Sequence, residues 1–172
     1  MNGQKTEIVA RLDTGLDAFK NAVDACPAAI ASIRPTPDRW SVLDCIEHLV
    51  RAEDYLSEQL AAGTPVMPSV NQPREARILQ IGTDRSHRIP APPMSLPTGR
   101  WATLADAMHA LEAARARTIR FVERFDGDLR AWQATHPIAG VVNGYEMLLI
   151  IAVHPLRHAR QVDEIRATLP LA

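Results

Sequence analysis

The stretch GYEMLLIIAVHPLRHARQVDEIRATL, residues 144–169, decides between two fold classes. Its apolar run, Met147–Val153, has the length of a buried strand, but the chain offers no other convincing strand for it to pair with. A long helix that is apolar nearly all round in its first half fits the same residues, and such a helix lies at the centre of a fold. We therefore expect a central helix over residues 144–169.

Pro155 interrupts this predicted helix directly after His154. Proline lacks a backbone N–H and its ring crowds the carbonyl four residues earlier, here that of Ile151, at a cost of roughly 3 kcal/mol. Either the helix kinks at Pro155, or a new helix begins there with His154 at its cap. The apolar run before Pro155 favours the kink, and a restart would move His154 off the helix face that it shares with His158.

Three further segments show helical periodicity. The second, within residues 40–60, should start at about Ser41, because Ser41 with Asp44 resembles a capping box. The third, residues 103–125, begins with the capping signal of Thr103 with Asp106. The first ends before Pro27 and carries an apolar stripe at steps of four, four, three and four: Ile8, Leu12, Leu16, Phe19 and Val23. Four long helices predict an all-α fold, a four-helix bundle.

Residues 61–101, between the second and third long helices, hold seven of the 13 prolines of the chain. A stretch this long within a small domain is usually a lid or a binding loop. Residues 72–80 could form a short helix, with Pro73 at its first position. We expect a long Pro-rich crossover within one domain that spans residues 1–172. Residues 28–39 and 126–143 are interpreted as loops because of their prolines and glycines.

Composition excludes several classes of function. The chain has 172 residues, of which 47% are hydrophobic and 23% charged, as in ordinary soluble globular proteins. A net charge of −1 gives no electrostatic attraction to nucleic acid or to an anionic membrane. The N-terminus carries charges where a signal peptide needs apolar residues, and Cys26 and Cys45 form no CxxC. We expect a cytoplasmic protein.

His154 and His158 are four residues apart, so a helix places both on one face, with Gln161 on the same stripe. Two imidazoles with this spacing can bind one metal, but a catalytic zinc site has three protein ligands and an open position. His48 is the best third ligand, because it lies inside the second helix and bundle cores build metal sites from facing helices. We predict that these three histidines bind one divalent transition metal, with zinc and nickel as the first candidates.

Other roles are open for these residues. The H-x-x-x-H pair alone is a weak signal, and His48 could be a core histidine that a backbone carbonyl satisfies. Arg157 and Arg160 beside His158 look solvent-facing, although Arg157 could hold an anionic group of a substrate. Glu47 points away from the face of His48 and is interpreted as solvated.

The remaining histidines and two neighbours of His48 have simpler interpretations. Asp44 could orient the His48 ring, but we favour its role in the capping box. Cys45 is interpreted as a small buried thiol. His109 is expected on a helix surface, and His87 and His136 in loops.

Two stretches, RWSVLDCIEHLVRAE (39–53) and NGYEMLLIIAVHPLRHARQVDEI (143–165), resemble the DinB-like (DinB/YfiT) superfamily of metal-dependent four-helix bundles. The family pattern is a Trp-Ser pair with a histidine seven residues after the serine, followed by H-x-x-R-H-x-x-Q in the last helix. Residues 84–101 also resemble the Pro-rich crossover of this family. The matching positions here are Trp40, Ser41, His48, His154, Arg157, His158 and Gln161.

The resemblance implies a three-histidine metal site, a homodimer, and chemistry like that of the thiol-dependent S-transferases and maleylpyruvate isomerases of this superfamily. In those enzymes a low-molecular-weight thiol is activated at the metal. We expect a metal-dependent enzyme that transfers such a thiol to a small-molecule electrophile, with hydrolysis as the near alternative. No side chain stands out as a general base, which favours thiol transfer. The competing hypothesis is a ligand-binding or stress-associated bundle without catalysis, whose metal site is empty or vestigial.

Overall fold

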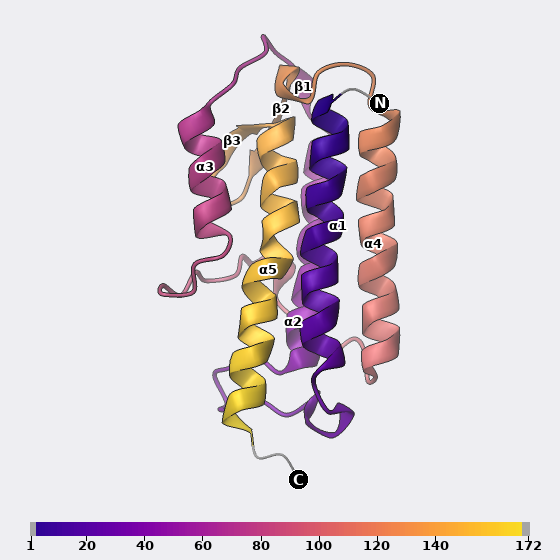
Figure 1. The fold of residues 1–172 in the computed structure, drawn as a ribbon, viewed down its shortest axis with the longest axis vertical. Coiled ribbons are helices and arrows are strands. Elements are labelled where there is room, and N and C mark those ends of the chain that lie inside the picture. The colour runs from indigo at the N-terminus through magenta and orange to yellow at the C-terminus, as the bar shows by residue number, and fades with distance from the viewer. Residues whose placement is uncertain (1–2, 170–172) are drawn as a thin grey trace.

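A computed structural model describes residues 3–169, which form five α-helices and a small three-stranded sheet. Four helices are long and run side by side (Figure 1): α1 (Gly3–Asp24), α2 (Val42–Ala61), α4 (Leu104–Arg124) and α5 (Gly144–Thr168). The expected four-helix bundle is therefore confirmed in its main features. Along the chain, α2 is followed by β1, α3 (Gln72–Ile81) and the short 3-10 helix η2 (Pro93–Ser95) before α4 begins.

The central helix is α5, which packs against α1, α2 and α3. It is buried along most of the stretch from Gly144 to Ala159, as expected for a segment that is apolar nearly all round. The helix continues through Pro155 without a break, so the alternative in which a new helix starts there is wrong. His154 and His158 consequently share one helix.

Capping fixes where the helices begin. Ser41 and Asp44 form the expected capping box at α2, and the Thr103 side chain accepts a hydrogen bond from the backbone of Asp106 at α4. α5 has a capping box as well, made by Asn143 and Glu146. Each cap satisfies N–H groups that the first turn of a helix leaves without partners.

The interpretation of residues 126–143 as a loop is wrong, and the fold is mostly helical rather than all-α. β1 (Thr64–Pro65), β2 (Trp132–His136) and β3 (Gly140–Asn143) form an antiparallel sheet in that order. Gly140 has a φ of +71°, which a residue with a side chain rarely adopts, and it follows the turn that joins β2 to β3. The strands are too short to show a period of two along the sequence.

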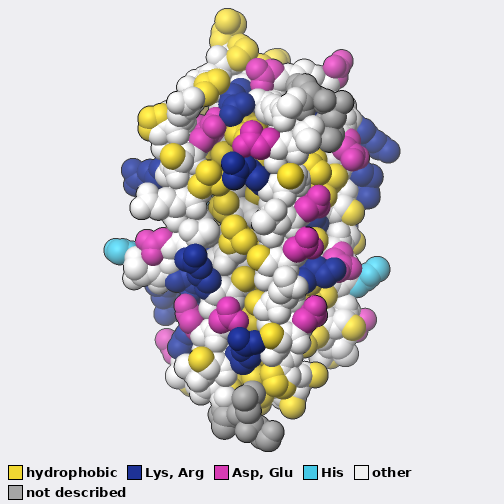
Figure 2. Space-filling view, in the orientation of Figure 1, with side chains coloured by type: hydrophobic (Ala, Val, Ile, Leu, Met, Phe, Trp, Pro, Cys, Tyr) yellow, Lys and Arg dark blue, Asp and Glu magenta, His cyan; other side chains and the backbone are white. Residues whose placement is uncertain are grey.

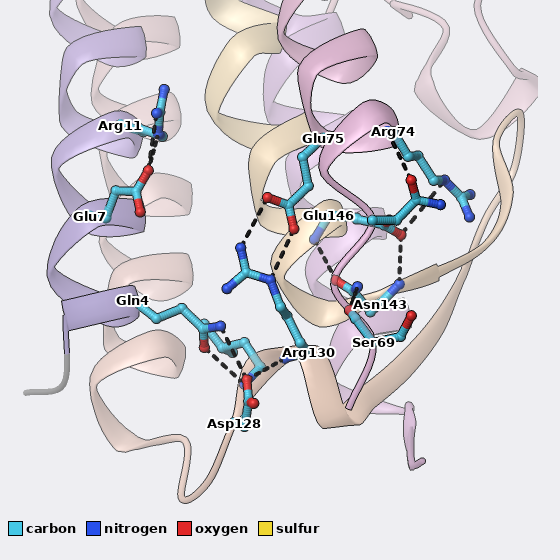
Figure 3. A network of polar contacts seen from close by, with 12 residues as sticks. Gln4, Glu7, Arg11, Ser69, Arg74, Glu75, Asp128, Arg130, Asn143 and Glu146 are labelled. Atoms are coloured by element: carbon cyan, nitrogen blue, oxygen red, sulfur yellow. Dashed lines mark hydrogen bonds and ion pairs between the residues drawn. The ribbon is translucent and has the colours of Figure 1, made fainter. Parts of the chain in front are cut away.

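Polar contacts fasten α3 and the sheet to one end of the bundle (Figure 3). Glu75 of α3 accepts two hydrogen bonds from Arg130, at 2.9 and 3.0 Å. Arg74 donates to the carbonyl oxygen of Val141 at 2.8 Å, and the Asn143 amide donates to that of Ser69 at 3.0 Å. These contacts tie residues 69–75 to residues 130–143.

The core extends along the whole bundle in two adjoining regions. The first includes Phe19, Val23, Leu49 and Val162, and the second includes Leu12, Leu56, Leu148 and Ile151. α5 passes from the second region to the first between Ala152 and Ala159, the stretch that contains both of its histidines. Within residues 3–169, no helix combines the length and the apolar character needed to cross a membrane.

Candidate metal centre

Three histidines from two helices meet inside the bundle, as the sequence predicts. The Nε2 atom of His154 lies 3.1 Å from that of His48 and 3.0 Å from that of His158. One ring nitrogen from each residue lies within 4.8 Å of the others. His48 and His158 are buried, and His154 is partly buried.

A backbone carbonyl fixes the state of the His48 ring. The Nδ1 atom of His48 lies 2.8 Å from the carbonyl oxygen of Ser95. A carbonyl only accepts hydrogen bonds, so the proton is assigned to Nδ1, and Nε2 keeps its lone pair directed at the other two histidines. The carbonyl that satisfies a core histidine thus also leaves that histidine ready to bind a metal.

The two Nε2–Nε2 distances at His154 fit a shared transition metal. A neutral imidazole has one N–H, so the Nε2 atom of His154 can donate to only one of its two neighbours. If that nitrogen carries no proton instead, its lone pair faces the lone pair of His48 in a buried place, which is unfavourable without a cation between them. Zn–N bonds of about 2.0–2.1 Å in a tetrahedral or octahedral site separate neighbouring nitrogens by about 2.9–3.4 Å. The distances at His154 fall within that interval.

Burial also keeps the rings neutral, as metal ligands must be. It lowers the pKa of His48 to about 4, against a hydrogen bond to Ser95 that raises it. The pKa values of His154 and His158 lie well below the ordinary value, first because burial disfavours the charged form and then because neighbouring rings repel a second charge. Among the residues that the structure describes, the buried Nδ1 atom of His158 has no hydrogen-bond partner.

Trp40 forms a wall beside two of the rings. Its ring centroid lies 4.7 Å from that of His48 and 6.1 Å from that of His158, and the second pair is stacked at 20°. The tryptophan of the Trp-Ser pair therefore holds both imidazoles in orientation and limits the access of water from its side.

Two expectations about neighbouring charges are wrong. Glu47 is buried, with 2% exposure, and does not point to solvent. Burial raises its pKa, but hydrogen bonds from residues 98–100 hold the pKa below its ordinary value. Arg157 is also buried and donates to the carbonyl oxygen of His87 at 2.6 Å. In both cases the segment before α4 covers a helix face that periodicity alone would leave exposed.

Other candidates lie outside the cluster. Asp44 binds Arg34 and caps α2, as favoured, so it does not orient His48. Cys45 is a fully buried thiol, whose pKa burial raises strongly.

Gln161 accepts a hydrogen bond from Arg85, and His109 is exposed. The ring of His136 accepts hydrogen bonds from the backbone of the β2–β3 turn, and His87 lies in the segment before η2.

Glu53 is a functional candidate that the sequence reasoning missed. It borders a narrow gap together with His154, and the other lining residues are Leu49, Leu56, Ile151 and Pro155. The gap is too narrow for a water molecule. A signal was present in the sequence, because Glu53 interrupts the apolar stripe of Leu49, Leu56 and Leu60 on α2.

Comparisons with known proteins agree with this picture. A sequence profile described as the DinB superfamily matches residues 11–162. The structure is similar to that of TT2238, a four-helix bundle protein, with a TM-score of 0.61 and 18% identity over 93% of this chain and 98% of that one. It is also similar to YfiT from Bacillus subtilis, described as a probable metal-dependent hydrolase with an unusual four-helix bundle topology. That likeness has a TM-score of 0.59 and 14% identity, over 96% of this chain and 87% of YfiT. No curated protein matches the chain.

Proposed function

The chain belongs to the DinB superfamily, and from this premise we propose that it is a metal-dependent enzyme that transfers a small thiol to an electrophile. The metal would be held by His48, His154 and His158. The observation that carries the proposal is the convergence of three Nε2 atoms, with the lone pair of His48 directed at the others by the Ser95 carbonyl.

A divalent transition metal held by the three histidines would lower the pKa of a coordinated water or thiol and so supply a nucleophile at neutral pH. Three protein ligands leave a further position for such a group. Trp40, Leu49 and Leu56 surround the site with apolar surface, which limits competing hydrolysis. In this proposal, residues 61–101 are a Pro-rich crossover that covers the metal site. The contacts of Ser95 with α2 and of His87 with α5 support this role.

Hydrolysis is the second candidate reaction. Glu53 shares the gap with His154, and a carboxylate in that place can accept a proton from an attacking water. YfiT, with its similar fold, is described as a probable metal-dependent hydrolase. Both oxygens of Glu53 already accept hydrogen bonds from Arg115, however, which weakens Glu53 as a base. We therefore place thiol transfer first, since a thiol bound to the metal would lose its proton to solvent without a base from the protein.

A binding function without catalysis is the alternative from another class. It is favoured by the narrow gap beside His154, which admits a substrate only if the surrounding side chains move. A bundle of this kind would keep the fold and the cover, with a metal site that is empty or vestigial.

The metal site is tested by elemental analysis of untagged protein. We expect one equivalent of metal per chain in the wild type and little in His48→Ala, His154→Ala and His158→Ala. His109→Ala serves as the control, because that residue is an exposed histidine on α4. Equal metal content in all five proteins would exclude the site.

The reaction is tested on the metal-loaded protein with small thiols and a chromogenic electrophile, and separately with activated esters and amides. Turnover that disappears in His154→Ala supports an enzyme. Glu53→Gln also leaves Arg115 without its counterion, so the variant is first shown to be folded and to hold metal. It then separates the two reactions, since only hydrolysis needs the carboxylate as a base. Absence of turnover on both panels, with metal occupancy verified, favours the binding function.

We further propose one domain that forms a homodimer in the cytoplasm. The apolar stripe of α1 is buried in the core and cannot supply the interface. Figure 2 shows apolar side chains at the upper end of the molecule and between charged ones along its face. At the end with the sheet, β3 is an edge strand, and several large apolar side chains are exposed: Val66, Met67, Val70, Ile138 and Val141. A monomer in light scattering at micromolar concentration would exclude the dimer.

A further inference from the structure

We propose that Glu47 is a positioning residue for the histidine cluster. Glu47 holds the turn at residues 98–100 and thereby fixes the Ser95 carbonyl that orients His48. The expected effect on metal binding rests on the proposed function, but the contacts that support the role of Glu47 lie entirely within the chain.

The carboxylate of Glu47 is clasped by one turn of backbone. Its Oε1 atom accepts hydrogen bonds from the backbone N–H and the hydroxyl of Thr98, at 2.8 and 2.7 Å. Its Oε2 atom accepts from the N–H groups of Gly99 and Arg100, both at 2.9 Å. Successive N–H groups that point at one place form an anion-binding nest. Gly99, with a φ of +81°, gives this turn the left-handed residue that such nests use.

Within residues 3–169, Glu47 forms no ion pair with a lysine or arginine side chain. A buried carboxylate without a cation is costly unless hydrogen bonds satisfy its lone pairs. The four donors of the turn do so, and charge-assisted hydrogen bonds are roughly twice as strong as neutral ones. The turn is therefore held at one place by Glu47, and a neutral side chain could not replace the carboxylate there.

His48, the residue of α2 after Glu47, holds the segment before this turn at a second point. Ser95 lies three residues before Thr98, and its carbonyl oxygen is 2.8 Å from Nδ1 of His48. The segment between the two contacts is stiff, because Pro93 and Ser95 belong to the 3-10 helix η2 and Pro97 fixes the backbone further. The Ser95 hydroxyl also donates to the carbonyl of Pro92 at 3.0 Å. A displaced turn would consequently displace the carbonyl.

The consequence for the site follows from the tautomer of His48. With the Ser95 carbonyl in place, the proton stays on Nδ1 and the lone pair of Nε2 faces the other histidines. Without it, the proton can move to Nε2, where it blocks metal binding. Loss of such an outer partner weakens metal binding by about 10–100-fold in known sites.

The experiment compares wild type with Glu47→Gln, which keeps the size but opposes an NH₂ group to N–H donors. The affinity for Zn²⁺ is measured by chelator competition, and the tautomer of His48 by ¹⁵N NMR of the metal-free protein. We expect about 10–100-fold weaker Zn²⁺ binding and a partial shift of the proton to Nε2. The matched control is Glu58→Gln, an exposed glutamate on the same helix, which should change neither quantity.

A second variant, Gly99→Ala, disturbs the turn from the opposite side without touching α2. No atom lies within 4 Å of the added Cβ, so the change acts through the positive φ rather than through a clash. Gly99→Ala should weaken Zn²⁺ binding and shift the proton of His48 toward Nε2, as Glu47→Gln does. This variant decides the question if Glu47→Gln does not fold.

The outcomes separate the two proposals. A folded Glu47→Gln protein with the wild-type tautomer of His48 overturns the positioning role, and so does one with the wild-type affinity for Zn²⁺. If the wild type itself binds no Zn²⁺, the proposed function fails, and the NMR comparison in the metal-free proteins still decides on Glu47. A merely structural role would lower stability and leave the tautomer unchanged.

Discussion

Arg115 of α4 and Glu53 of α2 form a doubly hydrogen-bonded ion pair inside the bundle, with Nε–Oε1 at 2.8 Å and Nη2–Oε2 at 2.9 Å. Their side chains are 1% and 5% exposed. The same guanidinium donates to the carbonyl oxygens of Leu12 on α1 and Ile151 on α5. One side chain thus joins all four long helices, next to the gap that His154 borders.

Replacing Arg115 by methionine should destabilise the protein strongly. The substitution keeps an apolar stem but leaves the Glu53 carboxylate buried without its cation, and breaking a buried ion pair in this way costs about 3–5 kcal/mol. Urea denaturation of metal-free protein measures the change in the free energy of unfolding. The double variant Arg115→Met/Glu53→Leu should recover much of the loss, because no unpaired charge remains.

The control for this prediction is Arg117→Met, which removes a neighbouring arginine of α4 from an exposed ion pair with Asp54. Exposed pairs contribute about 0–1 kcal/mol. Equal losses for Arg115→Met and Arg117→Met would mean that the interior ion pair does not hold the helices together.

Gly15 of α1 should tolerate no side chain. A Cβ atom there would lie 2.0 Å from the carbonyl oxygen of Ala152 on α5, and backbone atoms cannot yield as a flexible side chain does. We expect Gly15→Ala to lower the free energy of unfolding by about 1–3 kcal/mol or more, as overpacking does in cores. Gly3→Ala in the same helix is the control, since nothing lies within 4 Å of its added Cβ. A neutral Gly15→Ala would contradict the close approach of the two helices.

Arg157 should hold the segment before η2 against α5. Its guanidinium is buried and donates to the carbonyl of His87, between two trypsin sites at Arg85 and Arg88. Arg157→Met removes this contact, so we expect faster limited proteolysis at these two sites. Arg166→Met, a partly exposed position near the end of the same helix, should leave the rate of cleavage unchanged. Equal rates in all three proteins would show that Arg157 does not restrain the segment.

The helices could be predicted because their signals are local. Caps at Ser41 and Thr103 and the apolar steps along α1 act within a few turns of chain. The sheet could not, since β1 pairs with β2 across a separation in sequence that no periodicity reveals. Its strands have two to five residues, and their pairing depends on the ends of α2 and α5 already lying together.

For the candidate site, too, the residues placed by local signals could be predicted and those placed by tertiary contacts could not. The spacing of His154 and His158 is a property of one helix, and the position of His48 follows from a capped start, so the three could be placed together. The sequence predicts Glu47 and Arg157 to be exposed, because the segment that buries them is held by tertiary contacts alone. Nothing in its own sequence specifies which helix faces it covers.

Access to the site should depend on Leu56. This side chain lines the gap beside His154, which is too narrow for water as it stands. Leu56→Ala removes three carbons from the lining, so a small thiol should reach cobalt-loaded protein faster. Binding is followed by the charge-transfer absorption of a thiolate on cobalt. The variant should also lose about 2–5 kcal/mol of stability, as buried leucines do when truncated.

Leu60→Ala is the control that separates access from stability. Leu60 lies one turn further along α2 and is equally buried, with 1% exposure against 4% for Leu56, but it does not line the gap. Both variants should lose similar stability, and only Leu56→Ala should accelerate the binding of the thiol. Equal acceleration in the two proteins would mean that general loosening of the core admits the ligand. No acceleration in either would place the entry route on another side of His154, away from Leu56.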